Sequence, residues 1–154
     1  MQKTAFTVDL ENSVGPWIGK TTKIVDYYLH EALQQHGLDL TKEQMIVLKK
    51  LHQKDGLNQN ELARLTWRDK SSLARLLAKM EQKEYICRKQ LPSDKRINQV
   101  FLTATGREVF ETTRPVIQEI ISTMEKGISE ADIQHMITIL KRIQYNFTAE
   151  IASI

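Results

Sequence analysis

The chain is poor in residues that cross-link or interrupt a fold. Among its 154 residues there are 1 cysteine, 3 prolines and 6 glycines. One cysteine excludes an internal disulfide framework and fits a reducing cytosol. So few prolines and glycines leave little room for flexible linkers. The longest apolar runs fall far short of the roughly 20 residues of a membrane helix, and the N-terminus lacks an apolar signal segment. We therefore expect a cytoplasmic protein with one domain, or two small lobes sharing a core.

Apolar residues instead recur mainly at helical spacing, which predicts a mainly α protein. A change to strand-like spacing after residue 85 predicts one β-hairpin, whose turn is Pro92-Ser93-Asp94. Pro115 should kink the fifth helix or split it in two. The first expected helix lies within 10–35 and starts near Gly15-Pro16. The other expected helices cover 42–54, 58–65, 70–83, 104–126 and 130–147, and the expected strands cover 86–90 and 98–102.

Polar residues stand where helix starts need them. Thr41 with Gln44 forms the pattern of a capping box, and Asn58 with Glu61 repeats it. Further N-caps are expected at Asp69, Thr103 and Ser129. The second helix should bury Met45, Ile46, Leu48 and Leu51, and the fourth Leu73, Leu76, Leu77 and Met80.

Positive charge is concentrated in the middle of the chain. Residues 42–107 hold 15 Lys/Arg against 7 Asp/Glu, a surplus of +8, whereas the rest of the chain carries −5 and the total is +3. Duplex DNA is a dense line of negative charge and attracts such a surface whatever its sequence. The middle of the chain is therefore the candidate DNA-binding segment.

The helix over 70–83 has the pattern of a helix that enters a DNA groove. Its polar face carries Ser71, Ser72, Arg75 and Lys79 opposite the apolar stripe. Arginine can make two hydrogen bonds to guanine in the major groove, worth ~1–3 kcal/mol of discrimination. Backbone amides at the starts of this helix and of the 58–65 helix can anchor phosphates.

The hairpin carries a second basic group. Lys95 and Arg96 follow its turn, and such side chains can enter a narrow minor groove, where the negative potential is enhanced. We expect Asp94 to orient the hairpin by pairing with a nearby arginine.

The order and spacing of these segments resemble the multiple-antibiotic-resistance regulator (MarR) family. The runs that carry the resemblance are NQNELARL at 58–65, SSLARLL at 71–77, ICR at 86–88, SDKR at 93–96 and LTATG at 102–106. The resemblance implies a homodimer of winged helix-turn-helix subunits, with a lobe over 38–103 that binds DNA and a helical dimerisation region over 1–36 and 104–154. It also implies a bacterial or archaeal repressor, associated with the nucleoid and released by a small phenolic or aromatic effector.

The resemblance also assigns residue roles. Ser71, Ser72 and Arg75 take the recognition role, Arg88 lies at the base of the wing, and Lys95 and Arg96 lie at its tip. The full set expected to bind DNA is Asn58, Gln59, Arg68, Lys70, Ser71, Ser72, Arg75, Lys79, Arg88, Lys95 and Arg96.

Two positions depart from the family pattern. Glu84 stands where a glycine commonly follows the recognition helix, so this helix is expected to end differently. Lys95 stands where the family commonly has an arginine, and lysine lacks the planar guanidinium group that can donate two parallel hydrogen bonds. Arg96 is therefore the stronger candidate for a DNA contact at the tip of the wing.

Several residues have alternative interpretations. Trp17, Tyr27 and Tyr28 either line an effector pocket or form the dimer core. Cys87 is either a redox sensor or a small buried apolar residue, and the second use is commoner. The four histidines form no zinc pattern, and no enzyme motif or cofactor motif is present. The alternative function is a winged-helix module that docks on a protein without binding DNA.

Overall fold

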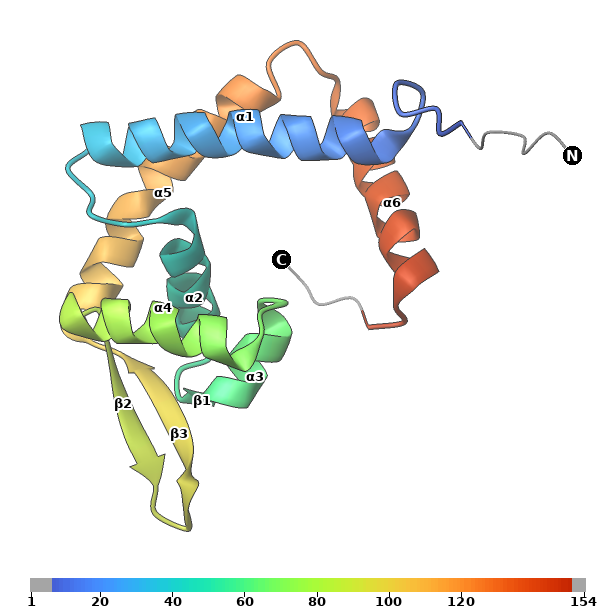
Figure 1. Ribbon diagram of the computed structural model, residues 1–154. Helices are drawn as coiled ribbons and strands as arrows, with labels where there is room; N and C mark the ends of the chain where they lie inside the picture. The colour runs from blue at the N-terminus through green and yellow to red at the C-terminus, as the bar shows by residue number, and fades with distance from the viewer. Residues whose placement is uncertain (1–6, 151–154) are drawn as a thin grey trace, which may run out of the picture.

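The computed structural model describes residues 7–150, which form six helices and three strands (Figure 1). The predicted mainly α, winged architecture is confirmed. In chain order the elements are α1 Val14–Gln35, α2 Lys42–Gln53, β1 Leu57–Asn58, α3 Gln59–Leu65, α4 Lys70–Gln82, β2 Ile86–Leu91, β3 Asp94–Leu102, α5 Ala104–Met124 and α6 Glu130–Phe147.

The predicted helix starts are confirmed. Thr41 and Gln44 form a reciprocal capping box at α2, and the side chains of Asp69, Thr103 and Ser129 accept backbone N–H groups at α4, α5 and α6. Each cap satisfies amides that the first turn of a helix leaves without intrahelical partners.

The middle lobe, from α2 to β3, holds the larger core. Its fully buried residues include Leu48, Leu62, Leu77 and Val100. The prediction for α2 was partly wrong, because Val47 is fully buried while Met45 and Ile46 are only partly buried. The buried stripe of α2 thus lies nearer Val47, which faces the core between α4 and the sheet.

The sheet has one strand more than the sequence predicts. The two-residue strand β1 pairs with β3 through Leu57–Val100 and Asn58–Gln99, giving the order β1-β3-β2. The two long strands, which form the wing, also extend further than predicted. They pair regularly from Ile86–Leu102 to Gln90–Asn98, and the register shifts before Leu91–Asp94. The predicted hairpin is therefore confirmed, and β1 adds a short third strand to it.

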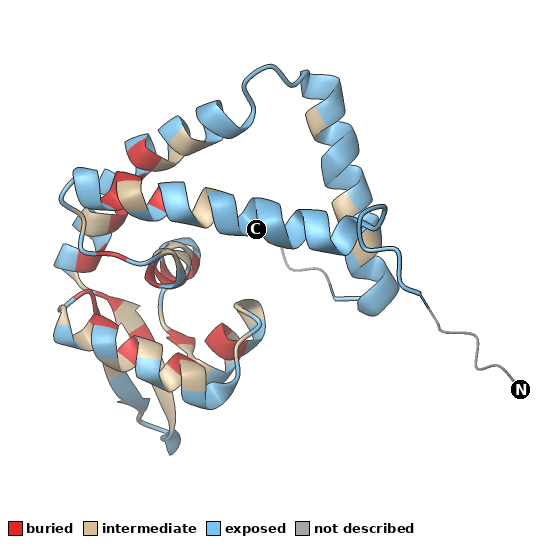
Figure 2. Cartoon of the chain, turned by 45° about the horizontal axis from the view of Figure 1, so that its top comes forward, coloured by how far each residue is buried: buried red, intermediate tan, exposed pale blue. Residues whose placement is uncertain are grey.

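The remaining helices form an open frame beside the middle lobe. α1 packs on α5 through a small cluster of Leu29, Ala32, Leu33 and Val116, whereas α6 buries none of its residues (Figures 1 and 2). α5 is one continuous helix through Pro115, so of the two predicted effects the split is wrong and the kink stays a prediction. Among residues 7–150 there is no helix with the length and apolar content to cross a bilayer.

The start of α5 is joined tightly to the base of the wing. Thr103 donates its backbone N–H to the Tyr85 carbonyl at 3.1 Å, and Arg107 pairs with Asp55 at 3.0 Å. Gly106 is buried there, and a Cβ added to it would lie 2.0 Å from the Tyr85 carbonyl oxygen. Only glycine allows this approach between α5 and the chain that leads into β2.

Candidate nucleic-acid interface

α4 is anchored on one side and open on the other. Leu73, Leu77 and Met80 are completely buried, which fixes the helix on the lobe core. On the open side Ser71, Arg75 and Lys79 are exposed, and their spacing of four residues aligns them along one stripe. The predicted basic stripe is thus free to meet a ligand.

Ser72 and Arg68 are engaged with each other at the start of this helix. Ser72 is partly buried, and its Oγ accepts a hydrogen bond from Arg68 Nη1 at 2.9 Å. Its backbone N–H donates to Asp69 Oδ1 at 2.8 Å. Both predicted residues therefore stabilise the turn before α4, and a ligand that binds them would compete with these hydrogen bonds.

The turn between α3 and α4 exposes an aromatic side chain that the sequence prediction did not assign to the site. Trp67 has a φ of 53°, and its side chain is 73% exposed. The left-handed region is costly for a bulky residue. The sequence places this aromatic residue in the turn of the helix-turn-helix, and that position could have marked Trp67 as a candidate site residue.

The far end of the wing carries paired and unpaired cations. Arg96 donates to both carboxylate oxygens of Asp94 at 3.1 Å, and its backbone N–H donates to Oδ1 at 3.0 Å. The Arg96 hydrogen bonds hold the pKa of Asp94 below its ordinary value, and the same pair raises the pKa of Arg96. Lys95 is exposed. A role for Asp94 in orienting the wing stays a prediction.

The base of the wing is tied to α4 by Arg88. Its guanidinium donates to Glu81 Oε1 at 3.0 Å, and its backbone N–H donates to Oε2 at 3.2 Å. The side-chain hydrogen bond lowers the pKa of Glu81. Arg88 was predicted as a DNA contact, but in this structure Glu81 already neutralises its charge.

The starts of α3 and α4 meet the wing at a small polar cavity. Its lining includes the predicted residues Asn58, Gln59, Lys70 and Arg96, together with Asn60, Ile97 and Asn98. The last three were not predicted, because asparagine on a strand or in a first helical turn carries no signal of its own. The cavity shows that Lys70 and Arg96 lie on the same side of the middle lobe.

The candidate effector residues are exposed on α1. Trp17, Tyr27 and Tyr28 are 58–61% exposed, and the two tyrosine rings pack edge to face with centroids 5.3 Å apart. Trp17 borders an open hollow with Leu10 and Lys20, but the tyrosines do not line that hollow. Within the described chain, no group of three or more His, Cys, Asp or Glu residues is placed to hold a metal ion.

An anchored helix with an open basic stripe, preceded by a helix-turn-helix turn and followed by a basic β-hairpin, defines a winged helix-turn-helix protein. Residues 40–97 match the model described as the MarR family. This segment therefore carries a MarR domain, and the predicted resemblance is confirmed over these residues.

A named relative is similar in sequence, and solved structures are similar in fold. Transcriptional regulator HosA of Escherichia coli O111:H- is 38% identical over 88 residues, which cover 56% of this chain and 65% of that protein. The alignment thus spans slightly less than two thirds of the curated relative. BpsR of Bordetella bronchiseptica matches the fold with a TM-score of 0.81 and 17% identity, covering 90% of this chain and 98% of that chain. The repressor CouR, bound to a 23-mer DNA duplex, also has a TM-score of 0.81, with 20% identity and coverage of 88% and 94%.

Proposed function

We propose that this chain is a sequence-specific regulator of transcription that binds duplex DNA as a homodimer in a bacterial or archaeal cytoplasm. The observation that carries the proposal is the stripe of Ser71, Arg75 and Lys79 on the open side of α4. A helix that is fixed on one side and carries Arg and short polar groups on the other can read base edges in the major groove.

The wing would supply the second contact. Lys95 and Arg96 are exposed on it, and Arg96 keeps outward-facing N–H groups although Asp94 accepts from it. A basic side chain at such a tip senses the width of a minor groove more than the identity of its bases. Arg88 would act through phosphates only where a phosphate displaces Glu81.

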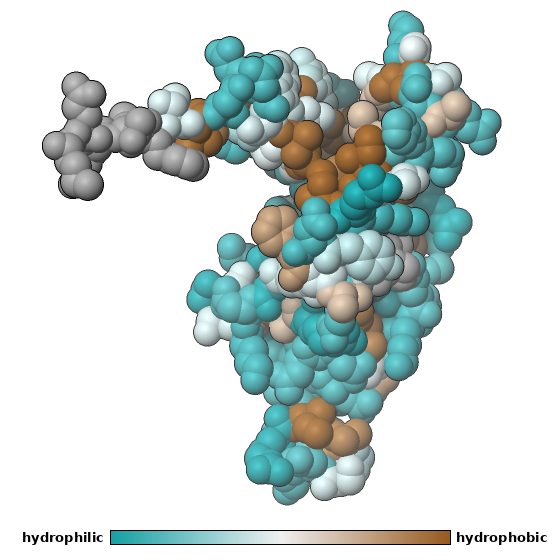
Figure 3. All heavy atoms as spheres, turned by 90° about the vertical axis from the view of Figure 1, so that its right-hand side faces the viewer, coloured by the Kyte–Doolittle hydropathy of each residue, from teal (hydrophilic) through white to brown (hydrophobic). Residues whose placement is uncertain are grey.

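The apolar faces of the open frame support the homodimer. Ile18 and Ile24 of α1 and Met136 and Ile139 of α6 are all more than a third exposed in one protomer. Apolar residues gather in the upper part of the face seen in Figure 3, above a largely hydrophilic middle lobe. Exposed apolar surface of this kind marks a protein interface. The dimerisation region would comprise residues 1–36 and 104–154.

The finer function that we propose is repression relieved by a small aromatic molecule. It is supported by the family and by two fold relatives, CouR, named as a repressor, and BpsR, whose DNA binding is regulated by 6-hydroxynicotinic acid. The exposed aromatic residues of α1 are the groups that such a molecule could contact. A gel-shift titration with a panel of phenolic acids tests this proposal, and operator binding unaffected by every compound would count against it.

The experiment that tests DNA recognition starts with selection of bound sequences from a random duplex pool. In Arg75→Ala we expect the preference for the selected site over competitor DNA to fall roughly 10- to 100-fold, because a bidentate base contact is lost. Fluorescence anisotropy with both duplexes measures the ratio.

Lys54→Ala is the matched control, because it removes one exposed charge of the middle lobe outside α4 and the wing. The preference of Lys54→Ala for the selected site over competitor DNA should equal that of the parent protein. A parent protein that binds no duplex would refute the proposal and favour a module that docks on another protein. Unchanged preference in Arg75→Ala would refute the role of Arg75.

A further inference from the structure

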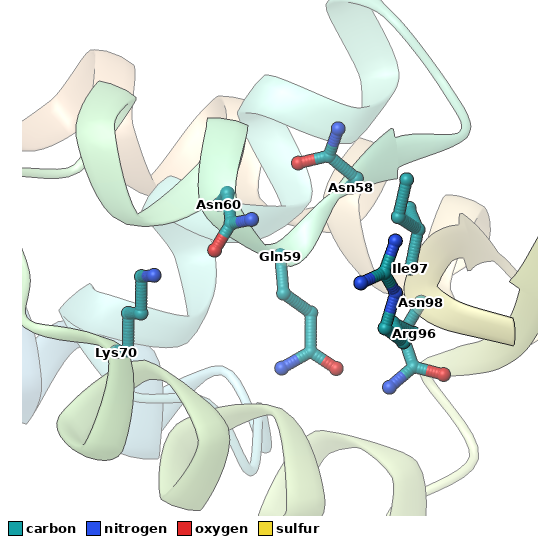
Figure 4. Close-up of a pocket in the computed structure, with 7 residues that line it drawn as sticks. All are labelled: Asn58, Gln59, Asn60, Lys70, Arg96, Ile97 and Asn98. Carbon is teal, nitrogen blue, oxygen red and sulfur yellow. The ribbon is translucent and has the colours of Figure 1, made fainter. Parts of the chain in front are cut away.

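The cavity between α3, α4 and the wing has the size and the lining of a site for a small charged group. Its volume is about 150 Å³, well above the roughly 10–15 Å³ that a single water needs on the same measure. Three segments build it, namely the start of α3, Lys70 at the start of α4, and Arg96 with Asn98 on β3 (Figure 4). We refer to it as the α3–β3 cavity.

Hydrogen-bond donors dominate this lining. The side chains of Asn60, Lys70 and Asn98 have no hydrogen-bond or ion-pair partner within residues 7–150. Arg96 uses Nε and Nη2 on Asp94 and keeps Nη1 available. Of the described residues that line the cavity, none is acidic. A site with cationic and amide donors and no carboxylate is suited to an anion.

Gln59 places a side-chain amide without hydrogen bonds in the lining of the cavity. Its side chain extends between Lys70 on one side and Arg96 with Asn98 on the other (Figure 4). Its Oε1 atom is buried and has no hydrogen-bond partner among the described residues. A buried polar atom without a partner is costly. Nε2 of the same amide also has no hydrogen-bond partner among the described residues, so its N–H groups are available to a bound anion.

We propose that the α3–β3 cavity holds one phosphate group of the DNA backbone, an inference that rests on the proposed function. Lys70 supplies the charge, since Asp94 already pairs with Arg96, and the amides of Gln59, Asn60 and Asn98 supply directional donors. The phosphate accepts from the N–H groups of Gln59 Nε2. Phosphate contacts of this kind fix the register of a protein on a duplex without reading its sequence.

The position of the cavity explains why a backbone phosphate fits better than a free one. One wall belongs to the base of the groove-entering helix and the opposite wall belongs to the wing. A single phosphate held between them would set the angle between the two elements while both are on the duplex. A free phosphate ion offers the same chemistry, so the experiment has to separate the two sources.

Asn60→Asp is the informative variant. It places a carboxylate at the cavity, and an acidic side chain in a first helical turn favours the helix, so the fold should persist. We expect affinity for duplex DNA to fall at least about tenfold for the selected and the random sequence alike, because like charges repel at close range. The slope of log affinity against log salt should decrease by about one for each phosphate contact that is lost. Gln53→Glu, an exposed position on the same lobe away from the cavity, controls for net charge.

A phosphate scan then locates the contact. Each phosphate of the selected duplex is replaced singly by an uncharged methylphosphonate, and affinities of parent and Asn60→Asp are compared as a double-mutant cycle. We expect one position in each half-site where the replacement weakens the parent and leaves the variant unchanged. Effects that add at every position, while the parent still binds DNA, would overturn the cavity assignment and leave the proposed function intact. A parent that binds no duplex refutes the proposed function itself.

Inorganic phosphate separates the two sources. Side-chain amide NMR signals of Gln59, Asn60 and Asn98 are followed during addition of sodium phosphate at constant ionic strength, and then during addition of duplex. We expect these signals to shift with duplex and to stay near their starting values in millimolar phosphate. Saturation by phosphate together with no response to duplex would overturn the assignment to DNA.

Discussion

At the scale of single residues, two non-glycine residues adopt backbone conformations that favour glycine. Trp67 has φ 53° after α3, and Glu84 has φ 62° after α4. At Glu84 the backbone bonds from Glu84 N to Glu81 O and from Tyr85 N to Met80 O, both 3.0 Å, close a left-handed helix end. The prediction that α4 ends differently without glycine is therefore wrong. The surrounding hydrogen bonds impose the same ending on glutamate.

Glu84→Gly should stabilise the protein by about 0.5–1 kcal/mol, since glycine adopts a positive φ without the steric cost that glutamate bears. Urea unfolding at fixed protein concentration measures the change. Glu108→Gly, at an exposed position within α5, should instead destabilise by about 1 kcal/mol. If both variants shift the midpoint in the same direction, the left-handed strain at Glu84 is not the cause.

At the scale of elements, the wing is attached to α4 by a single charged pair. Glu81 accepts from both the backbone and the guanidinium of Arg88. Because the arginine hydrogen bond depresses the pKa of Glu81 below its model-peptide value of 4.5, the stabilisation is complete above that value. This stabilisation of the folded protein is lost as the pH falls through the lowered pKa that Glu81 has in the folded state.

Glu81→Gln should therefore destabilise the protein at pH 7 by less than about 1 kcal/mol, since solvent screens a carboxylate that is 40% exposed. The gap between parent and variant should close as the pH falls below the lowered pKa of Glu81. Urea midpoints at pH 7 and pH 3 measure it. Glu108→Gln, at a carboxylate with no ion pair among the described residues, is the control. A gap that persists at pH 3 would mean that packing, not charge, holds the wing.

Elements that form through contacts between neighbouring residues could be predicted from the sequence. Elements that form through contacts between distant residues could not. The caps at Thr41 and Asp69 act over three residues, so their pattern is visible in the chain. β1 is only two residues long and exists because Leu57 lies opposite Val100. No local pattern encodes that pairing.

The same distinction applies to the candidate site. Ser71, Arg75 and Lys79 could be assigned from helical periodicity, and the structure leaves them exposed. The pairing of Arg88 with Glu81 and the orphaned amide oxygen of Gln59 depend on how α3, α4 and the wing meet in space. Asn60 and Asn98 were missed for that reason, since the cavity brings them together although they are 38 positions apart in the chain.

At the scale of the whole molecule, α6 is an amphipathic helix without a partner in one protomer. Met136 is 58% exposed and Phe147 is 88% exposed, and no residue of the helix is buried. A surface helix of this kind gains most of its stability from packing its apolar face. The second copy in the proposed homodimer would supply that packing.

Met136→Asp should therefore weaken the dimer more than 100-fold, because an unpaired carboxylate buried at an interface costs roughly 3 kcal/mol. Sedimentation velocity across a dilution series measures the dissociation constant. Gln134→Asp adds the same charge on another side of α6 and should leave the constant unchanged. Equal behaviour of both variants would place the interface elsewhere.

The joint at Gly106 has a mechanical consequence. α5 enters the wing base with no space for a side chain, and Thr103 and Arg107 fasten it on either side. A helix held this closely has little freedom to move against the wing base, so we expect the wing and α4 to follow it as one body. Any tilt imposed at the far end of α5 would thus change the spacing between the two DNA-binding surfaces of a dimer, with no internal rearrangement of either lobe.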